Sequence, residues 1–350
     1  MKKFFIGKKA IGLNQKCFIV AEISASHNNN LSHTLKLVRE AKKCGADAIK
    51  LQTYTPDTIT LKSNKLDFRI KKNSPWRKYK NLWNLYKEAH MPWEWQKKIF
   101  DLSKKLKLSY FSSPFDETAV DYLEKIGSQA YKIASPEINH LPLIKKVAKT
   151  KKPIIISTGL ATKKEIDEAV RVIKSVGNNK IVILKCTSSY PAKFDDLNLK
   201  MIETFYKRYN LNVGFSDHSV GYLPACVAVS LGAVMVEKHI KLGNSKNNVD
   251  NFFSSESKKF KDMVIAIRNS ERILGSINYD IPLNARVSLN GKRSIYVVKN
   301  IKKNEKLKKS NIRIIRPAYG LNPKYYPKVL GKKINTNLYI GDKLRLKNLK

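Results

Sequence analysis

Short β-rich runs alternate with amphipathic helical segments over most of this chain, from about residue 18 to residue 275. Between the runs, apolar residues recur at the helical spacing, as in HTLKLVREAKKCGA and EIDEAVRVIKSVG. This alternation builds parallel βα units, and eight consecutive units favour a closed (β/α)8 TIM barrel over an open doubly wound sheet. The eight strand candidates are CFIVAEIS, DAIKLQTY, LSYFSSPF, AYKIAS, PIIISTG, KIVILKCTSSY, NVGFSD and AVMVEKHI.

The character of the sequence changes at about residue 280. Short strands and turns follow, as in SIYVVKNI and YIGDKLRL, and no long helical period is present. We therefore expect a catalytic barrel domain over residues 1–280 and a small β-rich domain over residues 281–350, with a linker at about 276–290. A chain of 350 residues is long enough for both.

The net charge is unusual for a soluble protein. The sequence has 68 Lys and Arg against 28 Asp and Glu, a formal charge of +40. Such a charge attracts anions, and a catalytically inactive polyanion-binding protein is one hypothesis. The lysines are scattered and form no basic stripe with interleaved aromatic residues, so general lysine enrichment without a specific nucleic-acid partner is favoured.

The cysteines and the apolar segments indicate the compartment. Cys17, Cys44, Cys186 and Cys226 lie far apart and form no CxxC pair, which is typical of reduced thiols in the cytoplasm. No apolar stretch has the length of a membrane span, and the N-terminal apolar pieces are too interrupted for a signal peptide. We expect a soluble cytoplasmic protein that does not associate with membranes.

Every strand candidate ends in polar or ionisable residues, although the strand bodies are apolar. In a TIM barrel the chemistry lies at these carboxyl ends, so the groups should surround one pocket. The lysines of three strands need anionic partners if they are buried. Either they pair with Glu22 and Glu237 in a closed ion network, or they bind a ligand with several negative charges. We favour the ligand because cations and hydroxyls outnumber acids at the strand ends; the lysines are Lys50, Lys132 and Lys185.

Two further segments suit phosphate, namely STG at 157–159 and TSS at 187–189. Each offers hydroxyls and backbone N–H groups directly after a strand, at the start of the following helix.

The last two strand candidates both end near a histidine, His218 in GFSDHSVG and His239 in VMVEKHIKL. Because these strands are neighbours in a barrel, the two imidazoles can reach one point. Imidazole nitrogen suits borderline divalent ions, and two protein ligands leave positions open for water and substrate. A structural zinc site would need four protein ligands. The pair therefore predicts a catalytic metal centre, and His27 is a further candidate site residue.

Taken in order, several motifs resemble those of the nonulosonic (sialic-type) acid synthases. They are AEISASHNNN, GADAIKLQTYTPDT, FSSPFDETAVDYLE, YKIASPEIN, IISTGLAT, LKCTSSYPA, GFSDHSVG and EKHIKL. LQTYTPDTITL, FDETAVDYLE and RPAYGLNPKY are most similar to the pseudaminic acid synthase branch. The C-terminal domain resembles the antifreeze-like (SAF) domain of these enzymes in RSIYVVKNI, RPAYG and IGDKL.

The resemblance implies a reaction. Phosphoenolpyruvate and water would condense with an N-acetylated amino sugar of the 2,4-diacetamido-2,4,6-trideoxy-L-altrose type, giving pseudaminic acid and phosphate. The alternative is an N-acetylneuraminate or legionaminate synthase that uses an N-acetylmannosamine-type sugar. The cofactor would be a divalent metal, Mn²⁺ before Mg²⁺ or Co²⁺. The family also implies a domain-swapped homodimer, in which the SAF domain caps the barrel of the partner subunit.

Site residues follow from the matching positions. Glu22 would position or deprotonate the water, and the metal would sit on His218 and His239, with Asp250 completing the catalytic set. The residues expected to bind phosphoenolpyruvate are Lys50, Ser113, Lys132, Ser135, Ser157, Ser188 and Ser216. Those expected to contact the sugar are Gln52, Tyr190, Glu237, Asp250 and, at the N-acyl end, Arg316.

Three positions depart from the family pattern. Asn247-Asn248-Val249 stands where a Gly-Gly pair is usual before the acid, Ala318 replaces a common Gly in RPAYG, and Ser26 replaces a common Asn. None of them removes a metal or lysine position, so activity is expected.

Overall fold

The computed structural model describes residues 3–243 and 249–350, so Asn247 and Asn248 lie outside the described residues. The chain divides into two compact units, residues 1–275 and 276–350. Each unit is described below by itself.

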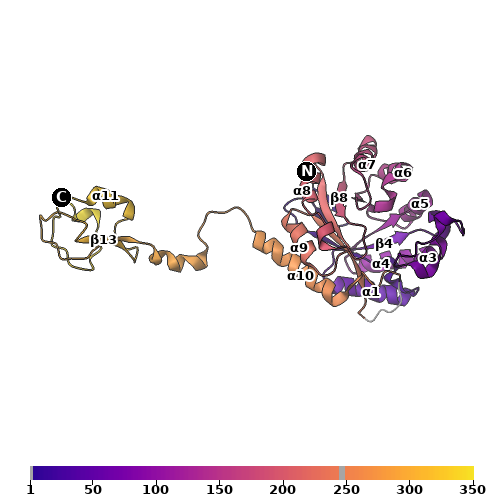
Figure 1. The fold of residues 1–350 in the computed structure, drawn as a ribbon, viewed down its shortest axis with the longest axis horizontal. Coiled ribbons are helices and arrows are strands. Elements are labelled where there is room, and N and C mark those ends of the chain that lie inside the picture. The colour runs from indigo at the N-terminus through magenta and orange to yellow at the C-terminus, as the bar shows by residue number, and fades with distance from the viewer. Residues whose placement is uncertain (1–2, 244–248) are drawn as a thin grey trace. The chain divides into compact units, whose positions relative to one another are not determined.

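The first unit is a closed barrel of parallel strands, as the alternating pattern predicts (Figure 1). Consecutive strands pair side by side, and β10 pairs with both β9 and β3, which closes the ring. A short strand, β11 (Ser255–Glu256), adds to the outer end of β10. The barrel strands are β3 (Phe18–Glu22), β4 (Ala48–Thr53), β5 (Ser109–Pro114), β6 (Tyr131–Ile133), β7 (Ile154–Ser157), β8 (Ile181–Cys186), β9 (Asn212–Asp217) and β10 (Met235–Lys241).

Helices follow the strands and cover the outside of the barrel (Figure 1). In α7, a capping box between Thr162 and Glu165 starts the helix, and its apolar positions turn inward at helical spacing. Within the described ranges, no helix is long and apolar enough to cross a membrane. The helices are α1 (Leu31–Lys43), α2 (Pro56–Ile59), α3 (Leu82–Ala89), α4 (Trp93–Lys105), α5 (Glu117–Lys125), α6 (Leu141–Lys149), α7 (Lys163–Ser175), α8 (Met201–Tyr209), α9 (Leu223–Ser230) and α10 (Ser257–Leu274).

Alternate residues of each strand face the barrel interior, because side chains of a strand point to opposite sides in turn. One buried apolar cluster fills this interior, and a second, larger cluster lies between the strands and the helices. In β8, Val182 and Leu184 belong to the interior cluster, whereas Ile181 and Ile183 belong to the outer one. This alternation decides which polar residues at the strand ends face the pocket.

A hairpin before the first barrel strand was not predicted from the sequence. Its strands β1 (Phe4–Ile6) and β2 (Lys9–Ile11) pair antiparallel. The interior cluster includes three residues of this hairpin, Phe4, Ile6 and Ile11. It also includes Phe18, the first residue of β3, so the hairpin packs at the amino end of the barrel strands. The hairpin therefore covers the end of the barrel opposite to the strand ends that carry the polar groups.

The second unit is built around a small antiparallel pair. The strands β12 (Ser294–Val297) and β13 (Ile312–Ile315) pair antiparallel, and the short helix α11 (Tyr326–Val329) packs near them. The unit has its own apolar core, which consists of Ile295, Val297, Ile301, Leu307, Ile312, Val329, Ile334, Leu338 and Leu344.

Candidate active site

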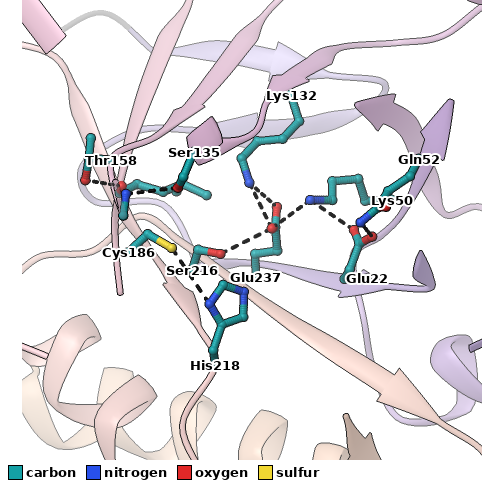
Figure 2. A network of polar contacts seen from close by, with 12 residues as sticks. Glu22, Lys50, Gln52, Lys132, Ser135, Thr158, Cys186, Ser216, His218 and Glu237 are labelled. Carbon is teal, nitrogen blue, oxygen red and sulfur yellow. Dashed lines mark hydrogen bonds and ion pairs between the residues drawn. The ribbon is translucent and has the colours of Figure 1, made fainter. Parts of the chain in front are cut away.

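Four charged side chains form a connected network at the carboxyl ends of the strands (Figure 2). The Glu237 carboxylate accepts hydrogen bonds from Lys50 Nζ at 2.8 Å and from Lys132 Nζ at 2.9 and 3.1 Å. Lys50 Nζ also lies 3.0 Å from Glu22 Oε2. All four side chains are buried, with no more than 5% of any of them exposed. Two ammonium groups thus share two carboxylates in a buried site.

The two acids of the network differ in protonation. Burial raises the pKa of Glu22 to about 7, although the Lys50 ammonium acts in the opposite direction. Burial opposes the ionisation of Glu237 too, but the adjacent Lys132 and Lys50 outweigh it and hold the pKa of Glu237 below its usual range. At neutral pH, Glu237 is a permanent anion, whereas Glu22 can take up or release a proton.

The structure therefore contains the closed ion network that was the less favoured hypothesis for Lys50 and Lys132. Lys185 does not join them. Lys185 follows Ile183 by two residues in β8, so both side chains point toward the helices. There Lys185 lines a cavity of about 490 Å³ together with residues of α7 and α8. There its Nζ donates to Cys186 O at 2.7 Å and Thr187 Oγ1 at 3.3 Å.

Beside the lysines lies a group of small hydroxyl side chains. Ser135 Oγ accepts a hydrogen bond from the Gly159 N–H at 2.9 Å. The Ser113 and Ser157 hydroxyls are buried and have no hydrogen-bond partner among the described residues. Because a buried hydroxyl without a partner costs free energy, these two groups indicate a polar ligand. Ser216 Oγ donates to Glu237 Oε1 at 3.3 Å, and Ser188 lies half-buried at the rim.

The two predicted histidines lie side by side, with ring centroids 5.4 Å apart. His218 Nδ1 is 3.0 Å from Thr187 O; a carbonyl only accepts, so Nδ1 carries the proton and Nε2 keeps a lone pair. Nδ1 of His239 is buried without a hydrogen-bond partner, and burial holds the pKa of His239 well below its ordinary value.

These histidine nitrogens fit a divalent cation held by two protein ligands. In the described part of the chain, no group of three or more His, Cys, Asp and Glu residues is placed to hold a metal. A cation here would therefore keep several coordination positions for water and substrate.

Cys186 is a site residue that sequence analysis missed. Its Sγ lies 3.8 Å from His218 Nδ1 and 4.0 Å from Ser188 Oγ. Burial raises the pKa of the thiol, but His218 and Lys132 outweigh this effect and bring it to about 7. The signal was present in the sequence, because Cys186 follows Leu184 by two residues and so faces the interior.

The remaining predicted residues fall into three groups. Gln52 Nε2 donates to Glu22 Oε1 at 3.3 Å, so it adjoins the network, and Asp250 Oδ2 lies 3.8 Å from His239 Nδ1, so it adjoins the histidine pair. Tyr190 stacks on His218 with centroids 4.5 Å apart. Arg316 is exposed and belongs to the second unit.

His27 was a candidate, but its ring is engaged elsewhere. His27 Nε2 is 3.0 Å from Ala89 O, and its Nδ1 accepts from the Asn29 N–H.

A (β/α)8 barrel with ionisable groups gathered at the strand carboxyl ends is the architecture of a barrel enzyme. The NeuB family model matches residues 37–279, and the SAF domain model matches residues 292–350. The chain belongs to the NeuB family and carries a C-terminal SAF domain.

Individual relatives agree with this assignment. The chain is 43% identical to a pseudaminic acid synthase of Campylobacter jejuni over 95% of this chain and 96% of that protein. It is 42% identical to a pseudaminic acid synthase of Helicobacter pylori over 90% and 92%. A crystal structure of an N-acetylneuraminic acid synthetase from Leptospira borgpetersenii in complex with citrate has 28% identity and a TM-score of 0.73, over 82% of this chain and 95% of that one.

Proposed function

We propose that this enzyme condenses phosphoenolpyruvate and water with a 2,4-diacetamido-2,4,6-trideoxy-L-altrose-type sugar, giving pseudaminic acid and phosphate. The observation that carries the proposal is the juxtaposition of two buried lysines, unpartnered hydroxyls and a histidine pair at one end of the barrel. The 43% identity to a pseudaminic acid synthase over nearly the whole chain supports the choice of acceptor.

The lysines and hydroxyls suit phosphoenolpyruvate, which carries a carboxylate and a phosphate. Lys50 and Lys132 would donate charge-assisted hydrogen bonds to these anionic groups. The unpartnered hydroxyls of Ser113 and Ser157 would donate hydrogen bonds to the same anionic groups. Three further serines of the site would assist them, namely Ser135, Ser188 and Ser216.

His218 and His239 would hold the divalent metal, for which we propose Mn²⁺. When bound, the ion would supply Lewis-acid polarisation of the sugar aldehyde. Tyr190, Gln52, Glu237 and Asp250 are placed around the histidines and the network and would orient the sugar hydroxyl and acetamido groups.

The reaction forms a C–C bond between the two substrates and a C–O bond from water to C2, and it breaks the C–O bond to phosphate. The former aldehyde oxygen gains a proton, which balances the proton that the water loses. C3 of phosphoenolpyruvate attacks the aldehyde carbon, and the oxocarbenium centre that forms at C2 is captured by water. Glu22 would take a proton from this water, and the C2–O bond to phosphate then breaks. Glu22 suits this role because it is fully buried and its pKa lies near neutrality.

A phosphate-release assay on the full-length protein tests the proposal. Phosphoenolpyruvate and Mn²⁺ are supplied with the diacetamido trideoxy-L-altrose or with N-acetylmannosamine, and the product mass is recorded. We expect release of phosphate to be fastest with the L-altrose sugar. Faster release with N-acetylmannosamine would favour the alternative acceptor, and no metal-dependent release with either sugar would overturn the proposal.

The pH dependence of turnover tests the role of Glu22. The carboxylate is the active form, so kcat/KM should fall about tenfold per pH unit below an apparent pKa near 7. In Glu22→Gln this acidic limb should disappear and kcat should drop by about 10²–10⁴-fold. Glu137→Gln is the matched control, because burial also raises the pKa of Glu137 to about 7. An acidic limb that survives in Glu22→Gln would contradict the role.

Gly159 should be essential for binding phosphoenolpyruvate. A Cβ atom at this position would lie 2.2 Å from Ser188 Oγ and 3.0 Å from both Cys186 Sγ and Ser135 Oγ. Gly159→Ala should therefore displace the hydroxyls and raise the KM for phosphoenolpyruvate by about 10- to 100-fold, or roughly 1.4–2.8 kcal/mol. Gly291→Ala, where a Cβ meets nothing within 4 Å, is the control. An unchanged KM in Gly159→Ala would place the phosphate elsewhere.

We also propose the domain-swapped homodimer and the cytoplasmic location that the family resemblance implies. In such a dimer, Arg316 of one chain would serve the N-acyl end of the sugar bound by the other. Mixing Arg316→Ala with His218→Ala chains tests this, because a hybrid dimer would hold one intact site and regain activity.

The four free cysteines are consistent with a reducing compartment.

A further inference from the structure

Four aromatic side chains form a connected cluster beside the histidine pair. Tyr190 and Phe253 stack at 4.7 Å between ring centroids, and Phe252 lies 5.0 Å from Phe253. Trp76 closes the cluster at 5.8 Å from both Tyr190 and Phe252. Phe253 also lies 4.7 Å from His239. We call these four residues the aromatic wall.

The aromatic wall is assembled from three segments that follow different strands. Trp76 belongs to the long segment after β4, Tyr190 follows β8, and the two phenylalanines follow β10. The Trp76 Nε1–H donates to Val249 O at 3.0 Å, which ties the first of these segments to the last. Since all three strands end at the same mouth of the barrel, the wall stands beside the predicted acceptor subsite.

The aromatic wall offers little hydrogen bonding to a ligand. The Trp76 N–H is already used by Val249, and the phenylalanine rings have no polar atom. The remaining polar group of the wall is the Tyr190 hydroxyl, which hydrogen-bonds with Ser188. Phe252 is 46% exposed and continues the apolar surface of the other wall residues, with its ring centroid 5.8 Å from Trp76 and 5.0 Å from Phe253. Apolar surface next to a polar reaction centre is typical of a subsite that recognises a methyl group.

We propose that the aromatic wall makes the enzyme prefer a 6-deoxy acceptor, by contacting the C6 methyl group of the sugar. This inference rests on the proposed function, since a trideoxy diacetamido sugar carries a methyl group at C6 where N-acetylmannosamine carries a hydroxymethyl group. The methyl group packs on the ring faces and leaves no polar atom unpaired. A hydroxyl at C6 would lose its water and find no partner on the faces of Trp76 and the two phenylalanines.

A pair of acceptors that differ only at C6 tests the inference. The probes are 2,4-diacetamido-2,4,6-trideoxy-L-altrose and its 6-hydroxy analogue, and the readout is the ratio of their kcat/KM values in the phosphate-release assay. We expect the unmodified enzyme to favour the 6-deoxy sugar by about 10- to 100-fold. Trp76→Ala and Phe252→Ala should each reduce this preference at least about fivefold, mainly by losing rate on the 6-deoxy sugar.

Trp83→Ala is the matched control. Trp83 lies in the same segment after β4, but its Nε1 donates to Asp57 at 2.8 Å and its ring contacts Lys62 and Lys87. In Trp83→Ala, the ratio of the kcat/KM values for the two sugars should equal that of the unmodified enzyme. The inference is overturned if Trp76→Ala and Phe252→Ala both keep the full preference for the 6-deoxy sugar, or if kcat/KM falls by the same factor for both sugars. Failure of the proposed function has a different result, namely no phosphate release by the unmodified enzyme with either sugar.

Discussion

Replacing His218 or His239 with alanine is expected to reduce metal-dependent phosphate release by at least about 1,000-fold. Polarisation of a carbonyl by a metal contributes several kcal/mol to the transition state, and about 4 kcal/mol corresponds to this factor. The two rings lie 5.4 Å apart and would supply the protein ligands of the ion, so neither ring can replace the other. The rate is measured at saturating Mn²⁺.

Direct metal binding distinguishes loss of the ion from a general defect. Isothermal titration with Mn²⁺ should show a clear loss of affinity in both variants, while the urea unfolding midpoint stays near that of the unmodified protein. His90→Ala is the control, because His90 Nδ1 lies 2.8 Å from the nearby Lys87 carbonyl oxygen on the surface. Full Mn²⁺ affinity in His218→Ala would show that the metal is bound elsewhere.

The barrel could be predicted because each strand and helix carries its own periodicity. The same periodicity explains the error on Lys185. In β8, Val182 and Leu184 point inward, so Cys186 points inward as well and Lys185 must face the helices. Counting alternate residues from the apolar interior would have replaced Lys185 with Cys186 among the strand-end groups expected to face the pocket. The prediction used the position at the strand end and left out the direction of the side chain.

Other features depend on contacts that no local pattern reveals. The aromatic wall joins segments separated by more than 100 residues, since Trp76 meets Tyr190 and Phe252 only after the barrel closes. The β1–β2 hairpin consists of three-residue strands, which are too short for a periodic signal. The choice between an ion network and a ligand site also depended on distances, and these distances show the ion network.

Because Glu237 alone holds both lysines, its removal should strongly destabilise the barrel. Among the described residues, Glu237→Ala would leave Lys132 without a carboxylate partner and Lys50 with only Glu22, in a buried site. Removing one partner of a buried ion pair typically costs about 3–5 kcal/mol, since the remaining charge stays desolvated. We expect a fall of this size in the free energy of unfolding of the full-length chain, measured by urea titration with circular dichroism.

An exposed ion pair provides the control, and phosphoenolpyruvate provides a second readout. Lys97 and Asp101 lie 2.6 Å apart on the surface, so Asp101→Ala should cost no more than about 1 kcal/mol. If the free energy of unfolding falls equally in Asp101→Ala and Glu237→Ala, the buried network contributes no more to stability than a surface ion pair. If the lysines bind the substrate anion, phosphoenolpyruvate should restore part of the stability lost in Glu237→Ala, because its negative charges take the place of the missing carboxylate. The ligand should then raise the unfolding midpoint more in this variant than in the unmodified enzyme, whereas a network that is only structural would give no such difference.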